Sequence, residues 1–489
     1  MSKLNVYLIF ICFILFLVSV CTAEHKSIQN DADQNFLMVK GNQLVNQKGD
    51  TVILRGFGLG GMLHMENFID GYPANEEAMR EGLLAALGPE KYNLYFEHFL
   101  KNYFTEPDAK YINSLGLNLV RIPINYHLFE DDMNPGVIKE EAFEHLDRVI
   151  DLCAKYNIYT IIDLHALPGF QNQHWHSDNP THIALFWKHK DFQDRALHLW
   201  EVIAKRYIDQ PWIAGYDLIN EPADPTGKKV FPYYKRLHDA IRKIDPNHIL
   251  FIEGNTYAKD FSMFTEVWDN VVYANHDYAR PGFGGDYPGY IDGKFIDKDS
   301  LEQVFLGKSD FMLKNNVPIW VGEFGPLYTG DPKQDDIRYQ VLKDQLTYYD
   351  KYKVSWCIWL YKDMGLHAIM HQKADTPYMR LVSAFLSRKD SLGVDSWGTS
   401  DKNIRQVIAP IEKLFEKEFP EYNPYPAGSK RHIRLLVRHI LMAEALTPEY
   451  CNLFKDLSEA ELIALAESFR YENYVKRQRL EDILTGREK

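Results

Sequence analysis

The sequence predicts an α/β protein, a (β/α)8 TIM barrel with long loop insertions and a C-terminal helical extension. Two observations lead to this prediction. Short runs of β-branched and aromatic residues alternate with stretches of helical spacing, and eight such runs lie between residues 52 and 360. Most of the runs are continuously apolar, which is typical of parallel strands that helices cover on both faces. Eight such units fit a closed barrel.

The eight predicted strands are Val52–Leu59, Leu117–Pro123, Tyr159–His165, Ile213–Asn220, His248–Gly254, Val271–His276, Pro318–Phe324 and Val354–Leu360. Helices are predicted between them, for example over Lys139–Tyr156, Asp191–Tyr207, Tyr233–Ile244 and Asp335–Lys351. The last of these begins after Asp331-Pro332, a typical helix start. A doubly wound open sheet is the alternative, but it ordinarily has fewer strands. No glycine-rich phosphate loop follows any of the runs.

Two long segments interrupt the barrel repeat, one after the first strand and one after the third. Met62–Leu115 has helical spacing of its own, and Phe170–Lys190 is rich in His, Trp, Asn and Gln. In a barrel enzyme, loops at the carboxyl ends of the strands surround the active site. Long loops here favour a closed pocket over an open cleft.

The C-terminal part differs in composition from the barrel. The turn-rich run Asn423–Ser429 is followed by a basic, amphipathic stretch, Lys430–Leu446. A second helix is predicted over Leu457–Phe469, with Ser458 and Glu461 spaced as a capping box. We therefore divide the chain into a signal peptide (1–23), a catalytic barrel (24–422) and a linker with a helical extension (423–489). The extension either packs on the barrel or serves assembly.

The N-terminus resembles a secretory signal peptide. Lys3 precedes an apolar run from Val6 to Val20, which is followed by Cys21-Thr22-Ala23. This run is short for a membrane span, so cleavage is expected after Ala23, and the protein is expected to be secreted or periplasmic. An uncleaved N-terminal anchor and a lipoprotein acylated at Cys21 are the alternatives.

Composition excludes several classes of protein. Hydrophobic residues make up 46% of the 489 positions and charged residues 25%, as in an ordinary globular protein. The formal net charge of −13 makes nucleic acid an unexpected partner. Outside the signal region there are three cysteines, Cys153, Cys357 and Cys451, too few for a disulfide framework, although one bridge among them stays open. The oligomeric state is not indicated.

Polar residues recur where the predicted strands end, and barrel enzymes place their catalytic groups there. From strand two to strand eight these residues are Arg121, His165, Asn220, Glu221, Glu253, His276, Tyr278, Glu323 and Trp359. Any one of them could be a satisfied polar residue at a strand end. Their recurrence on successive strands indicates an active site. Glu253 stands in a Glu-Gly-Asn sequence, which favours a role in a turn or in supporting the site.

Two carboxylates, Glu221 and Glu323, are predicted at opposite sides of the barrel mouth. Long side chains there can approach to the roughly 5 Å that double-displacement glycoside hydrolysis requires. Arg121 and Tyr278 could keep Glu323 ionised as the nucleophile, while Glu221 serves as acid and then base. Asn220 could bind the sugar 2-hydroxyl, and Trp359 offers a flat wall to the sugar ring.

These residues stand in motifs that resemble glycoside hydrolase family 5, a family of retaining (β/α)8 enzymes. The motifs are Asp217-Leu218-Ile219-Asn220-Glu221-Pro222, Gly322-Glu323-Phe324-Gly325, Arg121-Ile122-Pro123, Asp163-Leu164-His165, His276-Asp277-Tyr278, and Ser355-Trp356 with Trp359. The resemblance covers about Leu44 to Leu414. It implies that Glu221 is the acid/base and Glu323 the nucleophile. It also implies a substrate-binding set for the −1 sugar: Arg121, His165, Asn220, His276, Tyr278 and Trp359.

Finer features resemble the exo-β-1,3-glucanase and β-glucosidase branch. They are Leu59-Gly60-Gly61 with Glu66, and His165-Ala166-Leu167-Pro168-Gly169 with Gln171-Asn172. The resemblance implies that Glu66 binds hydroxyls of the −1 sugar. Met62 departs from the branch, which commonly has a Trp there, and the loop His174-Trp175-His176-Ser177-Asp178 is fuller. Trp175 is either a sugar platform or a loop anchor.

The sequence therefore predicts a secreted retaining β-glycosidase that hydrolyses β-glucosidic bonds in β-glucan oligosaccharides or β-glucosides from the nonreducing end. β-Mannosidase, β-xylosidase, glycosylceramidase and a catalytically silent carbohydrate-binding protein are the alternatives. No cofactor is expected. His174 and His176 form a His-x-His pair, but no third ligand stands at a suitable spacing, so no metal is expected either.

Overall fold

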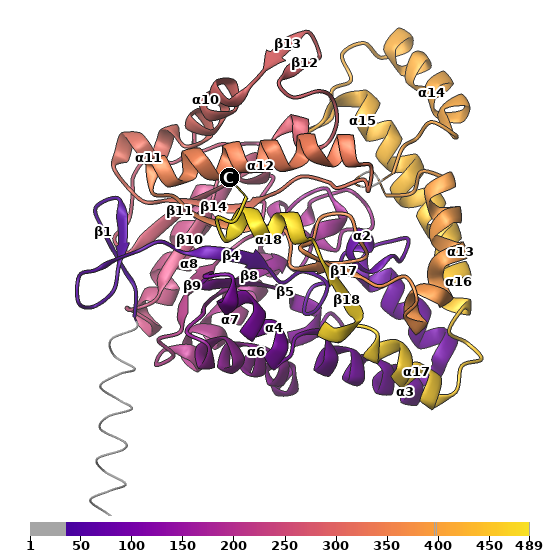
Figure 1. Ribbon diagram of the computed structural model, residues 1–489, viewed down its shortest axis with the longest axis horizontal. Coiled ribbons are helices and arrows are strands. Elements are labelled where there is room, and N and C mark those ends of the chain that lie inside the picture. The colour runs from indigo at the N-terminus through magenta and orange to yellow at the C-terminus, as the bar shows by residue number, and fades with distance from the viewer. Residues whose placement is uncertain (1–35, 396, 398, 489) are drawn as a thin grey trace, which may run out of the picture.

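A computed structural model describes residues 36–395, 397 and 399–488, so the predicted signal peptide lies outside the described residues. Eight parallel strands form a closed barrel (Figure 1). In order around the barrel they are β4 (Arg55–Gly58), β5 (Leu119–Asn125), β8 (Tyr159–Ala166), β9 (Ile213–Asp217), β10 (Ile249–Glu253), β11 (Val271–His276), β14 (Ile319–Phe324) and β15 (Ser355–Ile358). The predicted barrel and its eight strands are confirmed.

Alternate residues of the strands fill the barrel interior. The lower layers are apolar and include Leu119, Ile161, Phe251, Trp320 and Cys357, all buried. A three-stranded antiparallel sheet packs against this core through Leu37 and Leu44. Its strands are β1 (Met38–Lys40), β2 (Gln43–Val45) and β3 (Thr51–Val52).

Helices cover the outside of the barrel, as the alternation of apolar runs and helical spacing predicts. The four predicted helices are observed as α6 (Phe143–Lys155), α7 (Lys190–Tyr207), α8 (Val230–Ile244) and α12 (Pro332–Tyr352). Asp331 caps α12 by accepting hydrogen bonds from the backbone N–H groups of Lys333 and Gln334. The insertion after β4 contains α2 (Asn67–Asp70), α3 (Glu76–Tyr103) and α4 (Glu106–Ser114).

The remaining elements belong to loops or decorate the barrel. The helices are α5 (Tyr126–Phe129), α9 (Asn255–Ala258), α10 (Lys298–Lys308), α11 (Asp310–Asn315), α13 (Pro377–Ser391) and α14 (Arg405–Glu418). The strands form the antiparallel pairs β6 (Glu130–Asp131) with β7 (Asn134–Ile138) and β12 (Gly289–Ile291) with β13 (Lys294–Ile296), and the parallel pair β16 (Lys362–Asp363) with β17 (Met370–Gln372). Cys153, Cys357 and Cys451 are buried and free.

The C-terminal extension packs along the barrel. It consists of α15 (Gly428–Leu435), a π-helical turn (Leu436–Leu441), α16 (Met442–Asn452), α17 (Glu459–Glu467), β18 (Tyr474–Lys476) and α18 (Gln478–Leu484). Helix α17 lies beside α3, and β18 pairs antiparallel with β17 (Figure 1). The predicted capping box of Ser458 and Glu461 is present. Among the described residues, no helix is both long and apolar enough to cross a bilayer.

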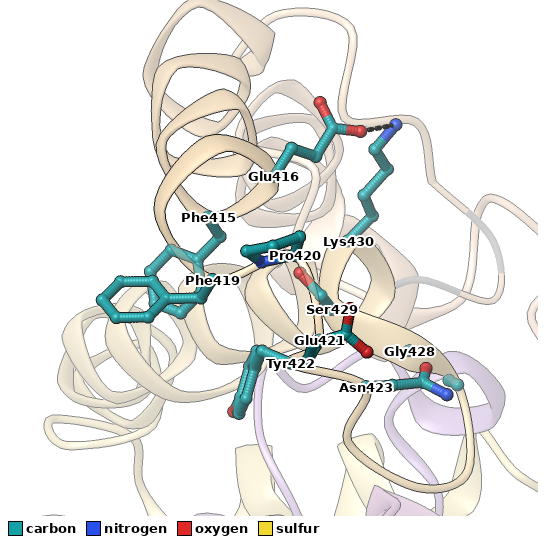
Figure 2. Close-up of a pocket in the computed structure, with 11 residues that line it drawn as sticks. Phe415, Glu416, Phe419, Pro420, Glu421, Tyr422, Asn423, Gly428, Ser429 and Lys430 are labelled. Atoms are coloured by element: carbon teal, nitrogen blue, oxygen red, sulfur yellow. Dashed lines mark ion pairs between the residues drawn. The ribbon is translucent and has the colours of Figure 1, made fainter.

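The linker end of the extension makes an open hollow between α14 and α15. Figure 2 shows Phe415, Phe419 and Tyr422 at this hollow, together with an ion pair between Glu416 and Lys430. Lys430 is therefore already paired within this hollow.

A buried ion pair joins the extension to the barrel. The Lys362 ammonium lies 2.6 Å from Asp108, and both side chains are fully buried. The same ammonium donates hydrogen bonds to the carbonyls of Tyr103, at 2.7 Å, and of Phe469 in the extension, at 3.3 Å. Lys362 thus connects the loop after the last barrel strand with α3, α4 and the C-terminal part.

We predict that Lys362→Met destabilises the protein by about 3–5 kcal/mol, because Asp108 would keep its buried charge without a counterion. The measurement is the free energy of unfolding in a denaturant titration. Lys101→Met is the matched control, since the Lys101–Glu97 pair is about half exposed and is expected to contribute less than about 1 kcal/mol. Equal losses in the two variants would contradict the prediction.

Candidate active site

The inward-facing residues of the barrel change from apolar to charged toward the carboxyl ends of the strands. Leu119 is followed two residues later by Arg121, Ile161 by Asp163, and Phe251 by Glu253. Because strand side chains alternate between faces, these pairs point to the same interior. The charged layer therefore rests directly on the apolar layers.

Arg121 is the centre of this charged layer and is fully buried. Its guanidinium donates to Asp217 at 3.0 Å, Asn220 at 2.8 Å and Glu323 at 2.8 Å. It also lies 3.2 Å from both Asp163 and Glu253. Burial by itself lowers the pKa of Arg121, but the surrounding carboxylates raise it well above its usual value. Arg121 is thus a permanent cation beneath the site.

Glu323, at the end of β14, has both carboxyl oxygens held. Arg121 donates to Oε1, and the Tyr278 hydroxyl donates to Oε2 at 2.8 Å. These two donors were predicted for this residue. Hydrogen bonds to both oxygens fix the orientation of the carboxylate.

Glu221 lies four residues beyond β9, in the left-handed backbone region with φ +46°. Non-glycine residues rarely adopt this conformation, which requires support from the surroundings. Glu253 provides the support, because its carboxylate accepts a hydrogen bond from the Glu221 backbone N–H at 2.6 Å. The supporting role predicted for Glu253 therefore has a definite geometry.

Two histidines contact the Glu221 carboxylate. His276 Nδ1 lies 2.7 Å from Oε1, and His176 Nε2 lies 3.0 Å from Oε2. Burial raises the pKa of Glu221, but the charges and hydrogen bonds of the two histidines outweigh burial and hold it well below its usual range. Burial lowers the pKa of His276, whereas Glu253, Glu323 and Glu221 raise it well above its usual value. A protonated His276 therefore pairs with an ionised Glu221 across a short contact.

The two catalytic candidates approach each other closely. One oxygen of Glu221, one of Glu323 and a nitrogen of His276 lie within 4.8 Å of one another. Retaining glycosidases have carboxyl groups about 5–5.5 Å apart, whereas inverting enzymes need a wider gap for water. The arrangement fits a retaining mechanism.

A cavity of about 340 Å³ opens above these carboxylates. Ten residues were predicted for the site, and nine of them line this cavity: Glu66, His165, Trp175, Asn220, Glu221, His276, Tyr278, Glu323 and Trp359. The tenth, Arg121, is buried without lining it. The structure therefore brings the predicted set together at one place.

Within the cavity, Glu66 and Trp359 lie on the side of Glu323. Burial, followed by the charges of Glu323 and Glu221, raises the pKa of Glu66 well above its usual value. The Trp359 ring stacks on His165, with ring centroids 5.3 Å apart and planes 8° apart. Asn220 is held by the Arg121 guanidinium and by His165, 3.2 Å away. These groups form a fixed polar and aromatic wall.

The loop after β8 carries Trp175 and the two histidines of the His-x-His pair, His174 and His176. Trp175 is almost fully buried and stacks on His439 of the extension, with ring centroids 3.7 Å apart. One ring face is therefore covered, as in a loop anchor, although the residue still lines the cavity. His174 also packs against His439, while His176 contacts Glu221. The two histidines thus have separate surroundings.

Three groups of side chains in the described part of the chain could supply metal ligands. They are Glu221 with His276 and Glu323, His64 with Glu66 and His165, and Glu77 with His127 and Asp132. The first is the catalytic candidate set, in which His276 already lies 2.7 Å from Glu221. Of the second group, Glu66 and His165 line the same cavity.

Several cavity residues were not predicted. Tyr257, Lys259, Asp395, Trp397 and Arg431 also line it. None stands at the end of a barrel strand, so reading strand ends could not find them. Arg431 comes from the extension, which the sequence places after a linker. The basic composition of Lys430–Leu446 was a signal, but it did not indicate which surface the helix covers.

Comparisons with known proteins agree with this geometry. The sequence family described as cellulase (glycosyl hydrolase family 5) matches residues 89–365. A β-xylosidase of Phanerodontia chrysosporium is 46% identical over 465 residues, covering 92% of this chain and 98% of that protein. A probable glucan 1,3-β-glucosidase A of Aspergillus fumigatus is 28% identical over 285 residues, 57% of this chain and 66% of that protein.

Among solved structures, the fold resembles rutinosidase from Aspergillus niger. The TM-score is 0.51 and the sequence identity 20%, over 64% of this chain and 90% of that chain. This similarity shows that the two proteins share a fold.

We predict that His176→Phe moves the alkaline limb of the pH profile to higher pH by about one unit. Removing His176 takes away a group that lowers the pKa of Glu221, so the carboxyl keeps its proton to a higher pH. The measurement is kcat/KM against pH on an aryl β-glycoside. His189→Phe, at an exposed position, is the control and should leave the profile in place. An unmoved alkaline limb in His176→Phe would contradict the assignment.

Proposed function

The chain belongs to glycosyl hydrolase family 5, and from this premise we propose that it is a retaining, exo-acting β-glycosidase with Glu323 as nucleophile and Glu221 as acid/base. One observation carries the proposal. The two carboxyl groups come within 4.8 Å of each other, and both oxygens of Glu323 are held by Arg121 and Tyr278. This combination of spacing and fixed charge suits double displacement.

In the first step, Glu323 attacks the anomeric carbon and forms a covalent glycosyl-enzyme. The glycosidic C–O bond breaks, and Glu221 gives a proton to the leaving oxygen. As the ester forms, the Glu323 carboxyl loses its negative charge. Tyr278 and Arg121 then stabilise the dipole of the ester carbonyl. His276 lies 3.6 Å from Glu323 and 2.7 Å from Glu221, and so couples the two carboxyls.

In the second step, Glu221 is a carboxylate and takes a proton from water. The oxygen of that water attacks the anomeric carbon, the ester bond breaks, and Glu323 is released as a carboxylate. Two inversions give retention of the β configuration. The lowered pKa of Glu221 favours this basic role, and His276, 2.7 Å away with a raised pKa, is placed to supply a proton when the acid is needed.

For the sugar, we propose a β-xylosyl unit first and a β-glucosyl unit second. The relative of 46% identity, matched over nearly its whole length, is named a β-xylosidase. Several other relatives are named glucan 1,3-β-glucosidases, and the position of Glu66 in the cavity suits binding of a sugar hydroxyl. Xylose and glucose present the same ring hydroxyl configuration and differ by the hydroxymethyl group on C5.

Exo action is supported by an aromatic wall that ends the cavity near Glu323. Trp397 donates its ring N–H to His367 at 2.7 Å and packs against Tyr278 and Phe283, with ring centroids 5.3 and 4.9 Å away. In this proposal the wall closes the cavity beyond the −1 sugar, so that one sugar is removed at a time. With the apolar N-terminal run, we further propose that the mature protein is secreted.

We predict that the purified protein releases xylose from an aryl β-xyloside with retention of configuration, and cleaves the matched β-glucoside more slowly. The measurement is a comparison of aryl β-xyloside, β-glucoside, β-mannoside and β-galactoside, with NMR of the first-formed anomer. A first product with the α configuration would exclude double displacement. Turnover of none of the four would favour a sugar-binding protein.

The products formed with added azide are expected to distinguish the nucleophile from the acid/base. In Glu221→Ala, azide should attack the glycosyl-enzyme and yield the β-glycosyl azide, because no base is required. In Glu323→Ala, azide should occupy the space of the lost nucleophile and yield the α-glycosyl azide. Without azide, Glu323→Ala should lose at least about 10⁴-fold in kcat. Glu97→Ala, at an exposed position on α3, is the control.

The stereochemistry of the azide products decides the assignment. A β-azide from Glu323→Ala or an α-azide from Glu221→Ala would reverse the two roles. No azide product from either variant, with activity lost in both, would contradict the covalent mechanism.

A further inference from the structure

The cavity is lined by two acidic side chains, Glu66 and Asp395, and by three cations. Arg280 lies 3.5 Å from Asp292, and the other two cations are Lys259 and Arg431. These cations come from distant parts of the chain. Lys259 follows the short helix α9 after β10, and Arg431 lies on α15 of the C-terminal extension. The extension therefore contributes to the surface of the active site.

Lys259 and Arg431 have no carboxylate oxygen within 4.0 Å in the part of the chain that the structure describes. Two basic neighbours of Arg431 on α15 do have carboxylate partners. Lys430 pairs with Glu416, as Figure 2 shows, and Arg434 lies 2.7 Å from Glu412. The chain as a whole has 68 acidic and 55 basic residues. In this acidic chain, Lys259 and Arg431 are thus two exposed cations on the cavity lining without a carboxylate partner among the described residues.

The two cations lie on the side of Glu221. His176 contacts Glu221 at 3.0 Å, and the Tyr257 ring lies beyond His176, with ring centroids 5.9 Å apart. Lys259 follows Tyr257 by two residues, and both line the same cavity as Arg431. A general acid donates its proton to the leaving oxygen, so the leaving group departs on the side of Glu221. This step of the inference rests on the proposed function.

We propose that Lys259 and Arg431 bind a carboxylate on the leaving part of the substrate, so that the protein prefers β-glycosides of acidic aglycones. A neutral sugar or alcohol would leave both cations without a counter charge. A carboxylate would be attracted to them, and the guanidinium can hold both of its oxygens. In this proposal the C-terminal extension is a specificity element as well as a structural one.

The experiment compares three aryl β-xylosides whose leaving phenols are of nearly equal acidity. Their para substituents are a carboxymethyl group, its methyl ester, and a 2-(trimethylammonio)ethyl group, each attached to the ring through a CH2 carbon. In the wild-type protein we expect kcat/KM to fall in the order carboxylate, ester, ammonium, with about a tenfold difference between the first two. The ratio should decrease in 0.5 M NaCl, because exposed charges are screened.

The double variant Lys259→Ala/Arg431→Ala should reduce the carboxylate-to-ester ratio to about one. Lys430→Ala is the matched control, since it removes a neighbouring cation of α15 that lies outside the cavity, and should keep the wild-type ratio. A ratio near one in the wild-type protein, or an unchanged ratio in the double variant, would overturn the proposal. Failure to turn over even the neutral ester would instead contradict the proposed function.

Discussion

The buried guanidinium of Arg121 is the interaction on which the rest of the site depends. Five polar side chains from four strands and the loop after β9 converge on it, and four of them are carboxylates. Without a cation at this point, so many buried acids would repel one another and take up protons. With it, the charged layer can rest on the apolar interior of the barrel. Of the four carboxylates, the nucleophile candidate Glu323 is the one that also lines the cavity.

Arg121 also explains how the acid/base candidate is placed. Glu253 contacts Arg121 with one carboxyl oxygen and the backbone N–H of Glu221 with the other. The left-handed conformation at Glu221 is thereby connected to the same charge that orients Glu323. The carboxyl groups of Glu221 and Glu323 therefore have different surroundings. Glu323 is held by a guanidinium and a phenol, whereas Glu221 faces the imidazoles of His176 and His276.

The C-terminal extension is integrated with the barrel at three levels. Lys362 connects it to α3 and α4 through buried contacts, and β18 continues the small sheet of β16 and β17. His439, in its π-helical turn, stacks on Trp175 of the loop that carries His176. Arg431 lines the cavity. Residues beyond the barrel therefore shape both the acid/base surroundings and the entrance to the site.

The sequence by itself determined the barrel, its eight strands, and the residues at the strand ends, including Glu221, Glu323, Arg121 and Tyr278. It could do so because apolar runs and strand-end positions are local features that barrel topology converts into one shared site. Only the tertiary structure decided that His176 contacts Glu221, that His439 covers Trp175, and that Lys259 and Arg431 line the cavity. These contacts join loops and helices that are far apart in the chain. Their geometry depends on tertiary packing, which the hydrophobic periodicity of the sequence does not specify.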